Sequence, residues 1–217
     1  MKTLKAENKG WILMNKGKII SLLAVSTLMA GSFATLQINQ NQVVMAKKKK
    51  TVSAAKSKKN LASAIQTPMT KENYENLENG LIESAQQDAQ DTSARLSGNS
   101  VDSKTEQQHI KKFNTRTGNL TKISEHNDKE VKTWKSSLTK SDYKMLKKYN
   151  KSLNKYIESL QDYASDVESE GAVKNDPNAS EQDKNDAQEA INKSQSKFNE
   201  AKNKWIQMYD QLSNNAQ

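Results

Sequence analysis

The sequence predicts an all-α protein: an elongated antiparallel four-helix bundle, built as coiled-coil hairpins, with a disordered basic arm at its N-terminus. Leucine and tyrosine alternate at the two core-facing positions of three successive heptads, namely Leu146, Tyr149, Leu153, Tyr156, Leu160 and Tyr163. The same period returns in two other segments. Only 34% of the residues are hydrophobic, and a narrow core-facing stripe, or seam, explains that low value without disorder. We therefore expect long helices around a thin core.

Residues 1–46 predict a secretory signal peptide. Five lysines against one glutamate precede residues 19–36, which hold no charged side chain. Cleavage is possible after Ala34 or, as we prefer, after Ala46. An uncleaved signal anchor is the alternative, because these 18 uncharged residues are just long enough for a bilayer core of about 30 Å. This leader, on a chain rich in lysine and asparagine, predicts a protein that is secreted or held at the cell surface of a Gram-positive bacterium.

The next segment, residues 47–69, is predicted to be a basic disordered linker. Residues 47–60 hold seven lysines and no acidic residue, whereas residues 61–217 hold 22 basic and 24 acidic residues. A linker and an electrostatic tether to anionic wall polymer or membrane headgroups are compatible interpretations. The arm has no aromatic side chain to stack on a base, so nucleic acid is not an expected partner. The candidate envelope-binding residues are Lys47, Lys48, Lys49, Lys50, Lys56, Lys58 and Lys59.

Capping signals divide residues 70–217 into four helices. The expected spans are about residues 70–97, 103–138, 140–170 and 180–214. Thr70 caps the first helix, and Gly98 follows its end. Each of the other three begins with a capping box: Ser103 with Glu106, Thr139 with Asp142, and Ser180 with Asp183. Residues 168–179, including Gly171, form the one long loop.

The seams also predict how the helices pair. If the last two helices fold back across the loop, the numbers of facing residues sum to about 350. Each tyrosine then faces a small residue: Tyr163 faces Ala187, Tyr156 faces Ser194, and Tyr149 faces Ala201. The second and third helices match with sums near 280, which places polar residues of the second helix near the tyrosine hydroxyls. The tyrosines are therefore expected to be core residues.

Charge separates along the predicted hairpin of the last two helices. Residues 129–155 hold nine lysines against two acids, and residues 158–189 hold ten acids against two lysines. Folded as a hairpin, the rod would be basic near the turn at 138–142 and acidic near the loop at 168–179. This arrangement suits orientation on a charged surface.

Nothing in the sequence predicts catalysis, so we expect a protein that is not an enzyme and needs no metal or cofactor. The two histidines, His109 and His126, lack the spacing and the third partner of a metal site. There is no cysteine, no nucleophile elbow and no glycine-rich phosphate loop. The predicted function is binding of protein or anionic wall polymer through helix faces and the lysine-rich arm. The alternative is a membrane-associated protein, either anchored by its leader or acting as a secreted membrane-active toxin.

Overall fold

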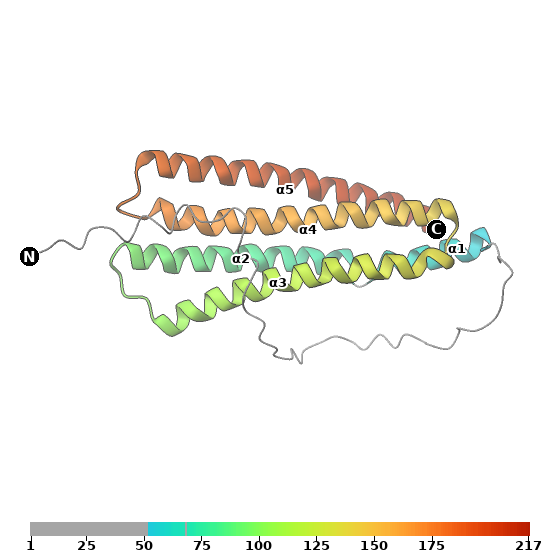
Figure 1. The fold of residues 1–217 in the computed structure, drawn as a ribbon, viewed down its shortest axis with the longest axis horizontal. Coiled ribbons are helices and arrows are strands. Elements are labelled where there is room, and N and C mark those ends of the chain that lie inside the picture. Colours follow the sequence, from blue (N-terminus) through green and yellow to red (C-terminus); the bar gives the residue numbers. More distant parts are fainter. Residues whose placement is uncertain (1–51, 68) are drawn as a thin grey trace, which may run out of the picture. The chain divides into compact units, whose positions relative to one another are not determined.

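A computed structural model describes residues 52–67 and 69–217, which belong to one compact unit. The predicted leader and Lys47 to Lys50 lie outside the described residues. Within them the chain is helical and contains no strand (Figure 1). The elements are α1 (Ala54–Ala64), α2 (Lys71–Leu96), α3 (Ser103–Thr133), the 3₁₀ turn η1 (Trp134–Ser136), α4 (Lys140–Lys174) and α5 (Glu181–Ala216). The prediction of an all-α helical bundle is confirmed.

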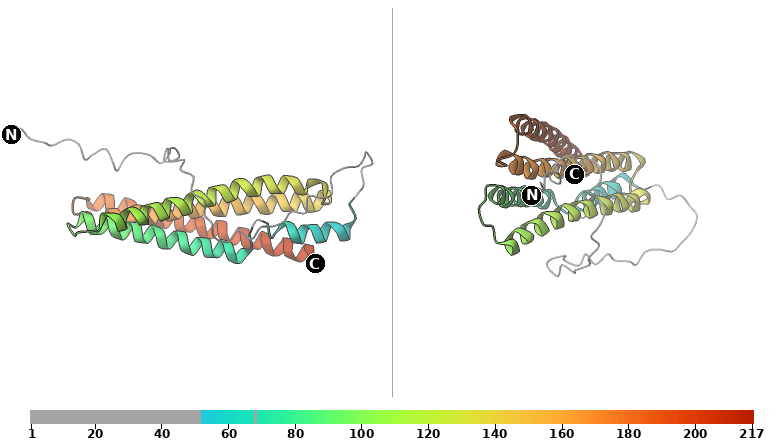
Figure 2. Two further views of the ribbon diagram at one scale, coloured as in Figure 1. Left: turned by 90° about the horizontal axis from the view of Figure 1, so that it is seen from below. Right: turned by 60° about the vertical axis from the view of Figure 1, so that its left-hand side comes forward.

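Helices α2 to α5 run up and down the bundle, so that each is antiparallel to the next (Figures 1 and 2). The central helix is α4, which packs along α5 on one side and against α2 and α3 on the other. With 36 residues, α5 is the longest helix and extends for about 54 Å. The four predicted helices are present, with boundaries displaced by at most five residues.

The structure corrects the expectation that residues 47–69 are disordered, because residues 54–64 form α1. Ser53 caps this helix, its side chain accepting from the backbone N–H of Lys56. The physical reason is a short apolar stripe: Leu61 and Ile65 follow Ser57 at helical spacing, and all three are buried. This stripe packs α1 against α4 and α5. Helix α1 is therefore a fifth element of the fold.

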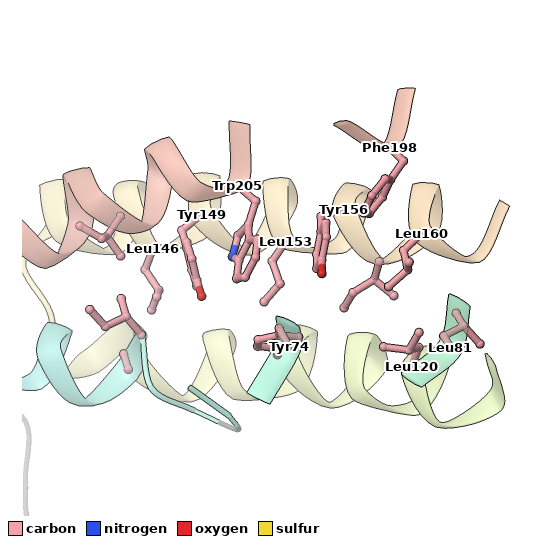
Figure 3. Close-up of a cluster of buried hydrophobic side chains, with 14 of the residues drawn as sticks. Tyr74, Leu81, Leu120, Leu146, Tyr149, Leu153, Tyr156, Leu160, Phe198 and Trp205 are labelled. Atoms are coloured by element: carbon pink, nitrogen blue, oxygen red, sulfur yellow. The ribbon is translucent and has the colours of Figure 1, made fainter. Parts of the chain in front are cut away.

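Tyr149 and Tyr156 of α4 are buried core residues, as predicted, and Tyr163 is partly buried; all three pack against aromatic side chains of α5. Figure 3 shows Trp205 of α5 pointing between the α4 tyrosines toward Tyr74 of α2. Its ring lies 4.6 Å from Tyr156 in a stacked arrangement and 5.7 Å from Tyr74 edge-on. Trp205 and Tyr156 are both fully buried. Burial raises the pKa of Tyr149 to about 12.

The predicted register of α4 against α5 is wrong by about one heptad. The predicted partner of Tyr156 is Ser194, whereas its ring packs against Phe198 and stacks on Trp205. The cause is Gly171, which we assigned to the loop. It lies inside α4, which continues to Lys174 before the turn. A Cβ at Gly171 would collide with the side chain of Ala89. The glycine therefore serves the close approach of α2 and α4, and large residues meet large ones across the hairpin.

The pairing of α3 with α4 follows the predicted register. Gln161 donates from Nε2 to the carbonyl oxygen of Thr117 and to Thr121 Oγ1, both at 2.9 Å. A polar residue of α3 also bonds to a tyrosine hydroxyl, as expected, but the tyrosine belongs to α2 and not to α4. Asn127 Nδ2 donates to Tyr74 Oη at 2.9 Å, so the buried amide joins α3 to α2.

Candidate anion-binding surface

Helix α1 joins the start of α4 through one buried serine. Thr139 caps α4, and its Oγ1 accepts from the backbone N–H of Asp142 at 3.2 Å. In the predicted capping box, the Asp142 carboxylate would accept directly from the backbone N–H of Thr139. Instead, Ser57 Oγ lies between the two. It accepts from Thr139 N at 2.8 Å and donates to Asp142 Oδ2. We call these hydrogen bonds the Ser57 relay.

A second hydrogen bond and an apolar contact hold α1 in the same place. Asn60 Nδ2 donates to the carbonyl oxygen of Ser137 at 2.8 Å. Leu61, one residue further along, is fully buried in the core. Polar and apolar contacts thus fix α1 against the turn that connects α3 to α4.

This docking places lysines from two distant parts of the chain on one end of the bundle. We call the set the basic end: Lys56, Lys58 and Lys59 on α1, Lys135 in η1, and Lys140 at the start of α4. All five side chains are exposed. None of them forms an ion pair with a described residue. The basic end is therefore free to attract a mobile anion.

The structure gives the basic end three of the seven predicted envelope-binding lysines. Lys56, Lys58 and Lys59 lie on α1, whereas Lys47 to Lys50 lie outside the described residues. The sequence did not associate Lys135 and Lys140 with the arm. It also contained a signal for α1 that the run of lysines obscured, namely Ser57, Leu61 and Ile65 at intervals of four.

A buried polar cluster joins α2, α4 and α5 in the middle of the bundle. Glu78 accepts from Tyr156 Oη at 2.6 Å through Oε2 and pairs with Lys202 Nζ at 2.8 Å through Oε1. Burial raises the pKa of Tyr156, as does its hydrogen bond to Glu78. Each carboxylate oxygen of Glu78 thus has a partner from the protein itself. This explains why an acidic residue is tolerated in the core.

The histidines lie on α3 and each contacts one carboxylate. His109 Nδ1 lies 2.6 Å from Asp91 Oδ2, and His126 Nε2 lies 3.9 Å from Glu130 Oε1. In the part of the chain that the structure describes, no group of three or more histidine and carboxylate side chains is arranged to hold a metal ion.

Three carboxylates lie together near the far ends of α2 and α4. Burial raises the pKa of Asp88 on α2, and the negative charge of Asp91 raises it further. Burial also raises the pKa of Glu168 on α4, with Asp88 as the second cause. The negative charges of this region therefore repel one another and are partly desolvated. The lysines of the basic end, in contrast, are exposed to solvent.

We found no protein-family model, curated protein or solved structure that matches this chain. None of the helices in residues 52–67 and 69–217 combines the length and the apolar character needed to cross a membrane. The predicted leader was outside that search.

Proposed function

We propose that this chain is an exported protein of the bacterial cell envelope that catalyses no reaction and binds an anionic envelope polymer through its basic end. The observation that carries the proposal is the docking of α1 by Ser57 and Asn60. It brings exposed lysines without carboxylate partners together on one end of the bundle. The predicted signal peptide supports export, and Lys47 to Lys50 add four charges just before α1.

The rest of the bundle supports a binding role over catalysis. Core positions that an enzyme of this class would use for metal-binding carboxylates and histidines hold Leu153, Tyr156 and Trp205. The buried Glu78 is already paired with Lys202 and Tyr156.

The proposal is tested by neutralising the α1 lysines. We expect Lys56→Gln, Lys58→Gln and Lys59→Gln together to weaken binding to isolated cell envelopes by about tenfold or more, because each lysine contributes up to about 1 kcal/mol near a strongly anionic surface. The matched control neutralises three exposed lysines of α5, Lys193, Lys197 and Lys204. Binding is measured by sedimentation with envelopes over a range of salt concentrations.

Salt should release the unmodified protein, because charges are screened over about 8 Å at physiological ionic strength. Equal losses of envelope affinity in the two triple variants would mean that binding depends on the net charge of the protein and not on the basic end. Binding that ignores both salt and the α1 lysines would refute the proposed function.

A further inference from the structure

We propose that the basic end is a composite site for a linear polymer with repeating phosphate groups, and that the Ser57 relay assembles it. This inference rests on the proposed function and adds the chemical class of the ligand and the contact that builds the site. Ser57 and Thr139 are 82 residues apart in sequence and 2.8 Å apart at the atoms that bond. Together with the Asn60–Ser137 hydrogen bond and the buried Leu61, this contact fixes the lysines of α1 beside those of the α3–α4 turn.

The lysine composition of the basic end favours a ligand recognised by charge density. Both arginines of the chain lie elsewhere: Arg95 pairs with Glu106 on α3, and Arg116 bonds to Gly80 and Ser84 of α2. Arginine offers a planar fork for bidentate recognition, whereas lysine is a compact point charge on a flexible stem. Several such charges on one surface suit a chain of regularly spaced phosphates better than one shaped anion.

The same surface lacks what firm attachment to a bilayer requires. Interfacial segments insert apolar side chains beneath the headgroups and use charge only as a second contribution. Among the described residues the exposed large hydrophobic side chain is Ile110, on α3, and the basic end has none. Leu61 of α1 and Ile65, which follows its end, are buried in the bundle core. A membrane surface is therefore the less suitable of the two anionic partners.

A polymer gains from fixed geometry in a way that a single phosphate does not. Once one phosphate is held, the next is presented to neighbouring lysines at high effective concentration. If α1 detached, Lys56, Lys58 and Lys59 would keep their charge but move independently of Lys135 and Lys140. The same five lysines would then bind the polymer more weakly, because binding would have to order α1 at a cost in conformational entropy.

The experiment separates docking from charge in the full-length chain. Ser57→Ala with Asn60→Ala removes the side-chain hydrogen bonds that dock α1 and leaves every lysine in place. The matched control is Ser63→Ala, an exposed serine of the same helix whose hydroxyl bonds only within α1. The probes are poly(glycerol phosphate), glycerol phosphate monomer, and vesicles of phosphatidylglycerol and phosphatidylcholine. Hydrogen exchange of the α1 amides reports whether α1 has detached.

We expect the docking variant to bind poly(glycerol phosphate) about tenfold more weakly, which corresponds to about 1.4 kcal/mol, with the monomer bound weakly by every form. Adding the three α1 Lys→Gln changes to the docking variant should weaken polymer binding by a smaller factor than the same changes do in the unmodified protein. The docking changes and the lysine changes act through the same contact with the polymer, so their effects should not add. If the α1 amides stay protected, Leu61→Asn replaces a fully buried leucine and detaches the helix.

Two results would overturn the composite site. One is undiminished polymer affinity when exchange shows α1 detached. The other is preference for vesicles over polymer by the unmodified protein, which would assign the surface to lipid. If the Lys→Gln changes weaken binding while detachment does not, the proposed function survives and only the composite site fails. If the unmodified protein binds no anionic probe, both fail.

Discussion

The half of the bundle that carries α1 and the half that carries the α2–α3 and α4–α5 loops are filled by different kinds of side chain. From the middle of the bundle toward α1 the core is aromatic: Trp205 meets Tyr74 edge-on and stacks on Tyr156, and each of the three is at most 1% exposed. In the opposite half Tyr163 stacks on Phe198 and Leu81 is buried, but the small residues Ala85, Ala89 and Ala164 occupy the other core positions of α2 and α4 there. There, α3 has no buried residue before Leu120, and α5 has none before Ser194.

This difference indicates that the two halves of one continuous bundle can differ in local stability. Burial of large side chains contributes most of the favourable free energy, and alanines contribute little. The loose half also holds the carboxylates whose pKa values burial raises, Asp88 and Glu168. The aromatic half can therefore serve as a rigid base for the basic end, while the opposite half should open locally at lower free energy.

The largest expected effect is the loss of the tryptophan that joins three helices. Trp205→Ala removes a fully buried ring and should lower the free energy of unfolding by about 3 to 5 kcal/mol. The matched change in the other half of α5 is Ile191→Ala at a half-buried position, which should cost less than about 2 kcal/mol. Urea denaturation followed by circular dichroism measures both. Equal costs would remove the distinction between the halves.

Next in size is the change at Gly171. Helix propensity alone predicts that alanine stabilises a helix interior by about 1 kcal/mol, but here its Cβ would collide with Ala89. We expect Gly171→Ala to destabilise the protein by about 1 to 3 kcal/mol. Gly118→Ala, in open space on α3, should stabilise it by up to about 1 kcal/mol.

Combining Gly171→Ala with Ala89→Gly should restore much of the lost stability, because the second change removes the colliding atom. If Gly171→Ala stabilised the protein as Gly118→Ala does, α2 and α4 would not approach closely there.

Caps and helix spans could be predicted because they depend on neighbouring residues. Thr70 and Ser180 cap their helices as expected, although Asp102 replaces Ser103 as the cap of α3. The register of the α4–α5 hairpin could not be predicted, because glycine occurs both in turns and where two helices approach closely. Gly171 serves the second purpose, which depends on the distant Ala89.

The candidate site was predictable only in part, for the same reason. The charges of Lys56, Lys58 and Lys59 are evident in the sequence. Their fixed position is not, because it depends on the contact of Ser57 with Thr139 and Asp142 across more than 80 residues.

The smallest expected effect is a pH response of the loose half. Asp88 faces Asp91 on its own helix and Glu106 and His109 on α3, and Glu168 faces it from α4. Raised pKa values mean that the folded chain holds these protons more tightly than the unfolded chain. Stability should therefore rise as pH falls from neutral through the raised values toward the ordinary carboxyl pKa.

The exposed caps Asp102 and Asp183 have lowered pKa values, because Thr105 and Ser180 bond to their carboxylates. Their contribution is lost only below the ordinary pKa. Asp88→Asn should raise the free energy of unfolding at pH 7 by about 0.5 to 1 kcal/mol, the scale of repulsion between neighbouring like charges, and should flatten the rise of stability on acidification. Denaturation at pH 5 and pH 7 measures this, and an unchanged slope would contradict it.

One hydrogen-exchange map of the full chain, recorded with and without poly(glycerol phosphate), tests the central claim that a rigid aromatic half presents a polyanion-binding end. Without polymer, amides around Tyr156 and Trp205 should exchange only through global unfolding, and those of residues 164–174 and 181–193 by local opening. With polymer, protection should rise in α1 and around residues 135–140. Protection that rises instead at the acidic loop between α4 and α5, or nowhere along the chain, would contradict the account.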